Sequence, residues 1–207
     1  MVNVKYIISG TKEDQPYKDL EIIKEIKSSS ENKTLTLLKN PTVVPRARIV
    51  TQYKVVDSKE RLFDNLKTMG TGLYDTVLLE NSVNIRQSKY NKQIEVKWIE
   101  DKNQYINLRT NLPVDGILVL ADMYEENWKA YDNGHEISIQ PANFMERAVV
   151  LKKGKHDIEF KYEPASFYLG MKISVVAYLI VLGTFVFNII NPKKFSSIIG
   201  KLSNRKK

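Results

Sequence analysis

The chain has 207 residues, a length that suits one domain of ordinary size with an appendage and allows a real core. Its formal charge of +8 at first suggests nucleic acid, but the last seventeen residues hold six Lys or Arg and no acid, which leaves about +2 for the rest. We therefore expect no nucleic-acid partner. The lack of cysteine excludes disulfides and thiolate metal sites, and the only two histidines, His135 and His156, would need carboxylates to complete a zinc site, so neither metal nor cofactor is expected.

The first part of the chain, residues 1–75, has a mixed α/β pattern. Residues 4–9 predict a strand, and the spacing of Leu20, Ile23 and Ile26 predicts a short amphipathic helix. Residues 34–40 and 46–56 predict further strands.

A second helix is expected after residue 56. Asp57 and Glu60 form a predicted capping pair for it, and Gly70 is expected to end it. Its apolar face would consist of Leu62, Phe63, Leu66 and Met69.

From residue 76 to residue 167 the pattern alternates with period two, and turn residues recur every eight to twelve positions. The predicted strands are 76–80, 82–87, 93–100, 104–110, 116–124, 146–151 and 156–162, together with a hairpin over 126–139. The fold class is therefore mainly β with a few short helices (α+β), an antiparallel β-sandwich or jelly-roll-like domain.

The hairpin carries the residues that could recognise a sugar. Trp128 would share one sheet face with Ala130, and Tyr131 would lie on the opposite face. The sequence Asp132-Asn133-Gly134 supplies a turn that tolerates positive φ, and His135 follows it as a solvated side chain. Two roles stay open for Trp128, a core position or a stacking platform for a sugar ring.

Catalysis has weaker support. Asp122, Glu125, Glu126 and Asp132 could supply the pair of carboxylates that glycoside chemistry requires, but sequence does not place them in one cleft. No nucleophile, phosphate-loop or zinc-protease motif is present. We assign no catalytic residue, and whether the chain has enzymatic activity stays open.

Residues 173–190 contain no charge, and as a helix they would span about 27 Å, close to the thickness of a hydrocarbon core. We predict a transmembrane helix over 168–190, with Lys172 extending toward the headgroups. The basic tail, residues 191–207, is expected in the cytoplasm, with Lys193, Lys194 and Lys201 contacting lipid, and the preceding domain outside. Residues 1–10 do not resemble a signal peptide, so either the charge rule fails or the chain is the C-terminal piece of a larger membrane protein.

Several motifs resemble the YfhO family of bacterial membrane proteins. They are W-K-A-Y at 128–131, the turn at 132–134, A-N-x-x-x-R-A-V at 142–149 and G-x-H-x-I-x-F-x-Y-x-P at 154–164. The likeness extends over residues 2–190. The chain departs from the family at Glu126-Asn127, where Pro-Gly is common, and at Asn133, which is inserted in the turn.

The resemblance implies a part of a large polytopic protein similar to membrane glycosyltransferases that use polyprenyl-phosphate sugars and glycosylate cell-wall polymers such as lipoteichoic acid. The family's catalytic acid lies in an early loop with no counterpart here. The chain would then be a noncatalytic accessory domain, with the bilayer, the remaining transmembrane part and a cell-wall polymer or glycan as partners.

The alternative is a stand-alone, membrane-anchored module that binds glycan or polymer. It would use Tyr124, Tyr131 and Arg147 on an exposed sheet face, with Trp128 beside them. Arg46 and Arg147 would be paired if they lie on inward positions.

Overall fold

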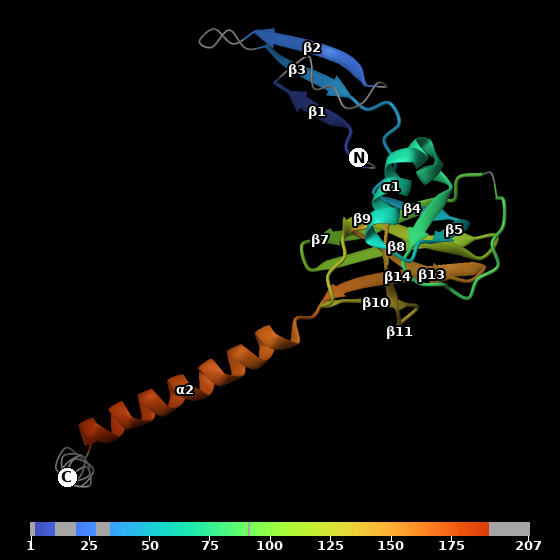
Figure 1. Cartoon of the computed structure of the whole chain (residues 1–207). Coiled ribbons are helices and arrows are strands. Elements are labelled where there is room, and N and C mark those ends of the chain that lie inside the picture. The colour runs from blue at the N-terminus through green and yellow to red at the C-terminus, as the bar shows by residue number, and fades with distance from the viewer. Residues whose placement is uncertain (1–2, 11–19, 28–33, 91, 191–207) are drawn as a thin grey trace. The chain divides into compact units, whose positions relative to one another are not determined.

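The computed structural model describes residues 3–10, 20–27, 34–90 and 92–190. Two compact units are present, Met1–Tyr162 and Glu163–Lys207. The first unit contains two large β-sheets, a small sheet and a helix, and the second contains one long helix (Figure 1). The predicted fold class, mainly β and antiparallel with one long C-terminal helix, is confirmed.

The larger sheet has six strands in the order β4-β9-β13-β12-β6-β5. Their bounds are β4 Ala47–Val50, β5 Gln52–Val55, β6 Thr76–Leu79, β9 Gly116–Met123, β12 Ile139–Ala142 and β13 Glu146–Leu151. All its pairs are antiparallel except β5 with β6. Two strands before residue 76, β4 and β5, therefore share one sheet with strands after it.

The second large sheet has five antiparallel strands in the order β11-β10-β14-β8-β7. Their bounds are β7 Val96–Lys102, β8 Tyr105–Leu112, β10 Trp128–Asp132, β11 His135–Ile137 and β14 Gly154–Tyr162. Ile158 and Phe160 of β14 are fully buried, whereas the alternate residues Asp157, Glu159 and Lys161 are only partly buried, as the period-two pattern predicts. Ser138 separates β11 from β12, so the chain changes sheets there.

The sandwich core lies between the two large sheets. It contains apolar residues of β8, β10 and β14 from one sheet and of β4, β9 and β13 from the other, including Leu108, Leu118, Val149 and Phe160. A second cluster on the other face of the six-stranded sheet includes Val119 and Ala148 and is joined by Val83 and Ile85. The strand predicted over 82–87 is wrong, since this segment forms no strand in the structure. Its apolar side chains pack against the sheet instead, and the Gln87 side chain accepts a hydrogen bond from the Tyr53 N–H at 3.2 Å.

The helix α1, Lys59–Met69, connects the parallel strands β5 and β6 and continues into the 3-10 turn Gly70–Tyr74. Ser58 caps it, since its hydroxyl accepts a hydrogen bond from the Arg61 N–H at 3.2 Å, so the predicted Asp57 cap is one residue too early. Leu62 is buried against Val56 and Leu78, with Leu66 and Met69 beside it. Phe63 is half exposed, so it does not belong to the buried face.

A small antiparallel sheet precedes these elements. It consists of β1 Tyr6–Ser9, β2 Glu21–Lys27 and β3 Thr34–Lys39 in the order β1-β3-β2. The helix predicted from Leu20, Ile23 and Ile26 is wrong, since this segment forms β2, which pairs with β3. Isoleucine is β-branched and favours strands, and the pairing of β2 with β3 includes a register shift between Ile22 and Lys24.

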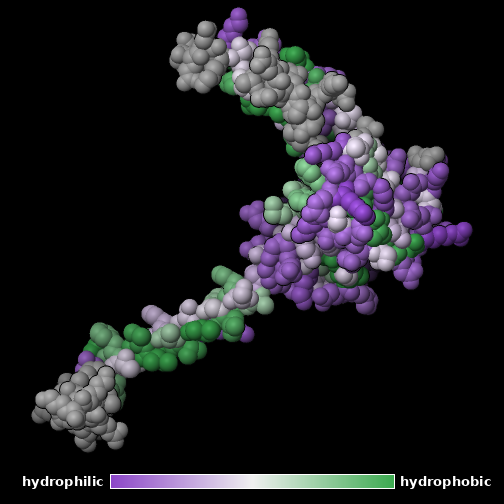
Figure 2. All heavy atoms as spheres, in the orientation of Figure 1, coloured by the Kyte–Doolittle hydropathy of each residue, from purple (hydrophilic) through white to green (hydrophobic). Residues whose placement is uncertain are grey.

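The helix α2, Ala165–Ile190, has 26 residues and a length of about 39 Å. None of its residues is buried in the structure, and it is long and apolar enough to cross a membrane. Figure 2 shows its surface as mainly hydrophobic. It begins three residues before the predicted span of 168–190, and the basic tail lies outside the described residues.

Candidate functional site

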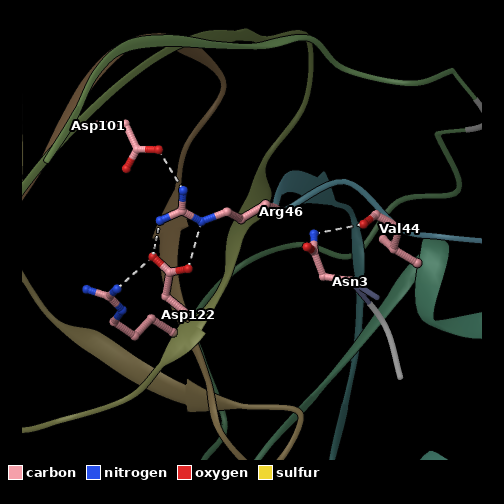
Figure 3. A network of polar contacts seen from close by, with 6 residues as sticks. Asn3, Val44, Arg46, Asp101 and Asp122 are labelled. Atoms are coloured by element: carbon pink, nitrogen blue, oxygen red, sulfur yellow. Dashed lines mark hydrogen bonds and ion pairs between the residues drawn. The ribbon is translucent and has the colours of Figure 1, made fainter. Parts of the chain in front are cut away.

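Four charged side chains form a ladder near the start of β4. Arg46 donates to both carboxylate oxygens of Asp122, at 2.8 and 2.9 Å, and its remaining nitrogen donates to Asp101 at 2.7 Å (Figure 3). Arg147 donates to the same Asp122 at 3.0 Å. One carboxylate therefore serves two guanidinium groups, a geometry that the planar fork of arginine favours.

Two tryptophans cover the ends of this ladder. The Arg147 guanidinium lies 4.0 Å from the ring centroid of Trp128, and that of Arg46 lies 4.8 Å from Trp98. The hydrogen bond to Asp122 raises the pKa of Arg46, whereas burial lowers the pKa of Arg147, opposed by the charge of Asp122. Both groups remain cations at neutral pH, because arginine titrates far above it.

A second buried ion pair lies on the other face of the same sheet. Arg48 donates to Glu146 at 3.0 Å, and both side chains are less than a tenth exposed. Asn143 donates to the same carboxylate at 2.8 Å and accepts a hydrogen bond from the Leu78 N–H at 2.9 Å. The sequence analysis missed this network, and of its residues only Asn143 is a fixed position of the A-N-x-x-x-R-A-V motif.

A groove of about 780 Å³ lies at the open edge of the sandwich. It runs between β4 and the segment that leads into β7, and these two strands are the edges of their respective sheets. Its lining combines aromatic rings, apolar side chains and charges, among them Tyr74, Trp98, Asp75 and Glu95. Such a mixture suits a ligand that presents both apolar and hydroxyl surfaces.

The outer face of the five-stranded sheet carries a row of paired polar side chains. Glu159 accepts hydrogen bonds from Tyr105 at 2.5 Å and from Lys161 at 2.8 Å, and the Lys161 amine lies 4.8 Å from the Tyr131 ring centroid. The hydrogen bond to Glu159 raises the pKa of Tyr105 to about 12. The bonds from Lys161 and Tyr105 lower the pKa of Glu159.

The structure divides the predicted glycan-binding residues between two faces. Trp128 packs on Arg147 and against Tyr162, with the two ring centroids 5.4 Å apart, whereas Tyr131 lies on the outer face. Arg147 is only 2% exposed, so the prediction that it lies on an exposed face is wrong. Tyr124 is half-buried, and its N–H donates to the Met145 carbonyl.

The acids considered for catalysis have structural partners. Asp122 holds the two arginines, and Asp132 bonds the Nδ1 of His156 at 2.8 Å. Glu125 bonds the neighbouring Asn127. Within residues 3–10, 20–27, 34–90 and 92–190, no group of three or more His, Cys, Asp or Glu could hold a metal ion.

Two further predictions concern the membrane. Lys172 lies on α2, none of whose residues is buried, and its contact with headgroups stays a prediction. Lys193, Lys194 and Lys201 lie outside the described residues.

Together the fold and these contacts define a two-sheet β domain joined to a helix that can span a bilayer. Residues 83–174 match the family model described as bacterial membrane protein YfhO, and this confirms the resemblance over that part of the chain. The matched region contains β7 to β14 and the first residues of α2. No curated protein and no solved structure matches the chain.

Proposed function

We propose that this chain is the C-terminal extracytoplasmic accessory domain of a YfhO-like membrane glycosyltransferase that glycosylates cell-wall polymers such as lipoteichoic acid, and that it is noncatalytic by itself. The observation that carries the proposal is the family match across the junction of sandwich and helix. The bonding of Asp122, Asp132 and Glu125 to neighbouring side chains supports a structural role for these acids.

One face of α2 supports packing against other transmembrane helices of the parent protein. Small or polar residues recur along it at alternating spacings of four and three, broken by one valine: Gly170, Ser174, Ala177, Val181, Thr184 and Asn188. This period is that of left-handed helix packing, and small residues let two helix backbones approach closely in lipid. Asn188 would find a hydrogen-bond partner there, which lipid does not offer.

Charge supports the proposed orientation. The tail after α2 is purely basic, whereas Lys161 on the preceding side is accompanied by Glu159 and Glu163. Under the positive-inside rule the tail is cytoplasmic and the sandwich extracytoplasmic.

The test is an immunoblot of native membranes with an antibody against the sandwich, combined with protease treatment of intact spheroplasts. We expect a species much larger than 23.9 kDa, cleaved from outside. A protected band near that mass would overturn both the parent protein and the orientation. A band near that mass that is cleaved from outside would favour the stand-alone module.

A second candidate function, the glycan- or polymer-binding module, is favoured by the groove at the sandwich edge and by Tyr131 on the outer face. Aromatic rings beside paired charges are suited to stack on sugar rings and bond their hydroxyls. Binding of wall polymer by the full chain in detergent would be measured for Tyr131→Ala and Tyr74→Ala. Loss in one variant alone would locate the site, and no binding by the unmodified chain at millimolar sugar would exclude the module.

A further inference from the structure

One wall of the groove in the sandwich is the edge of β4. The lining contains the consecutive residues 47–51 on this side and the consecutive residues 92–96 on the other. Side chains alternate between the two faces of a strand, so a pocket on one face contacts every second residue, whereas a pocket along the edge contacts each residue in turn. β4 also lies at the end of its sheet, beside β9. The groove therefore runs along the open edge of β4.

The backbone groups of Ala47 and Ile49 point into this groove. In an antiparallel pair, residues that exchange hydrogen bonds with the partner strand alternate with residues whose N–H and C=O point away from it. The Ala121 N–H donates to the Arg46 carbonyl at 2.7 Å, and the register with β9 continues without a shift through β4. Arg46 and Arg48 therefore face β9, and the N–H and C=O groups of Ala47 and Ile49 face the groove.

The chain itself bonds the next outward position along this edge. The Ser88 N–H donates to the Thr51 carbonyl at 3.2 Å, and the Thr51 hydroxyl donates to the Ser88 carbonyl at 2.7 Å. Among the residues that the structure describes, no group bonds the outward N–H and C=O of Ala47 or Ile49. Ala47 is only 7% exposed, and backbone groups that are shielded from water normally have a hydrogen-bond partner.

We propose that the groove binds an extended segment of a partner polypeptide, which adds to β4 as a further strand of the six-stranded sheet. Ala47 and Ile49 offer their donors and acceptors about 6.8 Å apart, which is the repeat of two residues in a strand. A peptide backbone carries N–H and C=O groups at this same repeat, whereas the hydroxyls of a sugar do not. An open strand edge is therefore best matched by another strand.

The lining also selects the side chains of the bound segment. Ile49 and Val96 both pack against the sandwich core and both line the groove. The side chains that the bound segment turns toward the core are therefore apolar, and they occupy every second position. This inference does not rest on the proposed function, since it holds for the sandwich of a stand-alone chain as well.

The experiment uses the full chain in detergent to select from an mRNA-display library of random peptides about eight residues long. Ile49→Pro tests the site, because it replaces an N–H that faces the groove with a ring, and proline is accepted in an edge strand where its nitrogen faces outward. Ile49→Val is the matched control, since it keeps both the N–H and a β-branched side chain. Urea unfolding checks that each variant is folded.

We expect enriched peptides with an apolar residue at every second position. Their affinity should fall at least about tenfold in Ile49→Pro and less than about threefold in Ile49→Val. A single N-methyl group moved along the best peptide should abolish binding at every second position only, because alternate N–H groups face β4. This series decides the question even if Ile49→Pro does not fold.

Two results would overturn the proposal. One is the absence of peptides that bind the unmodified chain more tightly than Ile49→Pro, or N-methyl effects without a period of two. The other is binding of purified wall polymer that is lost in Tyr74→Ala but kept in Ile49→Pro, with no peptide enriched, which would assign the groove to a glycan.

Discussion

Arg147 is 2% exposed, and Asp122, 3.0 Å away, is the only carboxylate bonded to it among the described residues. The same Asp122 forms a bidentate pair with Arg46, whose third nitrogen reaches Asp101. The two aspartates thus share Arg46 as a partner, but only Asp122 neutralises a buried charge. This difference allows the contribution of burial to be separated from that of ion pairing.

Asp122→Asn should destabilise the sandwich by about 3 kcal/mol, because it leaves the buried Arg147 without a counter-charge. Asp101→Asn should cost less than about 1 kcal/mol, since its pair with Arg46 is exposed on both sides. The measurement is urea unfolding of the full chain in detergent, followed by fluorescence. Both tryptophans, Trp98 and Trp128, belong to the sandwich and report its unfolding. Equal costs for the two variants would contradict the central role of Asp122.

Asn143→Ala should destabilise the sandwich by about 2 kcal/mol, because the buried Leu78 N–H and Glu146 carboxylate each lose a hydrogen bond and Ala tolerates the positive φ poorly. Asn103→Ala, in the exposed turn between β7 and β8, serves as the control and should change the free energy of unfolding by less than about 0.5 kcal/mol. Similar values for the two would show that the turn is not braced by Asn143.

Alternation explains why the sandwich strands could be predicted from sequence. In β14 and β10 one side of the strand is core and the other is solvent, so period two is visible in the residues themselves. The turn at Asn133-Gly134, with φ of 50° and 83°, was predictable for the same local reason.

The wrong predictions concern residues whose structure is set by contacts with residues far away in the sequence. Ile22, Ile23 and Ile26 are all exposed and have no buried face to set a period, so pairing with β3 rather than local spacing determines their structure. The site residues depended on the same kind of contact. Sequence placed Trp128 and Arg147 correctly on strands, but the burial of Arg147 follows from Asp122 on a neighbouring strand, which no local pattern reveals.

The pH dependence of stability should change in Glu159→Gln. The pKa of Glu159 is lowered in the folded chain, chiefly by Lys161, so its contribution is present above the ordinary value of 4.5 and is lost as pH falls through the lowered pKa. The variant should therefore lose less stability on acidification than the unmodified chain. Urea midpoints measured from neutral to acidic pH would check this, and parallel curves would contradict it.

The same substitution should affect an alkaline titration. Tyr105 has its pKa raised to about 12 by Glu159, so the stability that it contributes is present below pH 10 and is lost as pH rises through 12. In Glu159→Gln, its pKa should fall toward 10. The ultraviolet titration of each chain, minus that of the same chain carrying Tyr105→Phe, isolates this group among eleven tyrosines. An unchanged midpoint would show that Glu159 is not its acceptor.

The two histidines offer a last, internally controlled prediction. In His156, Nδ1 lies 2.8 Å from an Asp132 oxygen and Nε2 lies 2.7 Å from the Lys152 carbonyl, and the side chain is 8% exposed. His156→Ala removes both bonds and leaves the partly buried Asp132 without its partner, so it should cost about 2 kcal/mol. His135→Ala, at an exposed position just after the hairpin turn, should cost less than about 0.5 kcal/mol. The comparison is made by urea unfolding at constant pH. If His135→Ala lowered the free energy of unfolding more than His156→Ala, the residues of the turn would stabilise the hairpin more than the bond between Asp132 of β10 and His156 of β14.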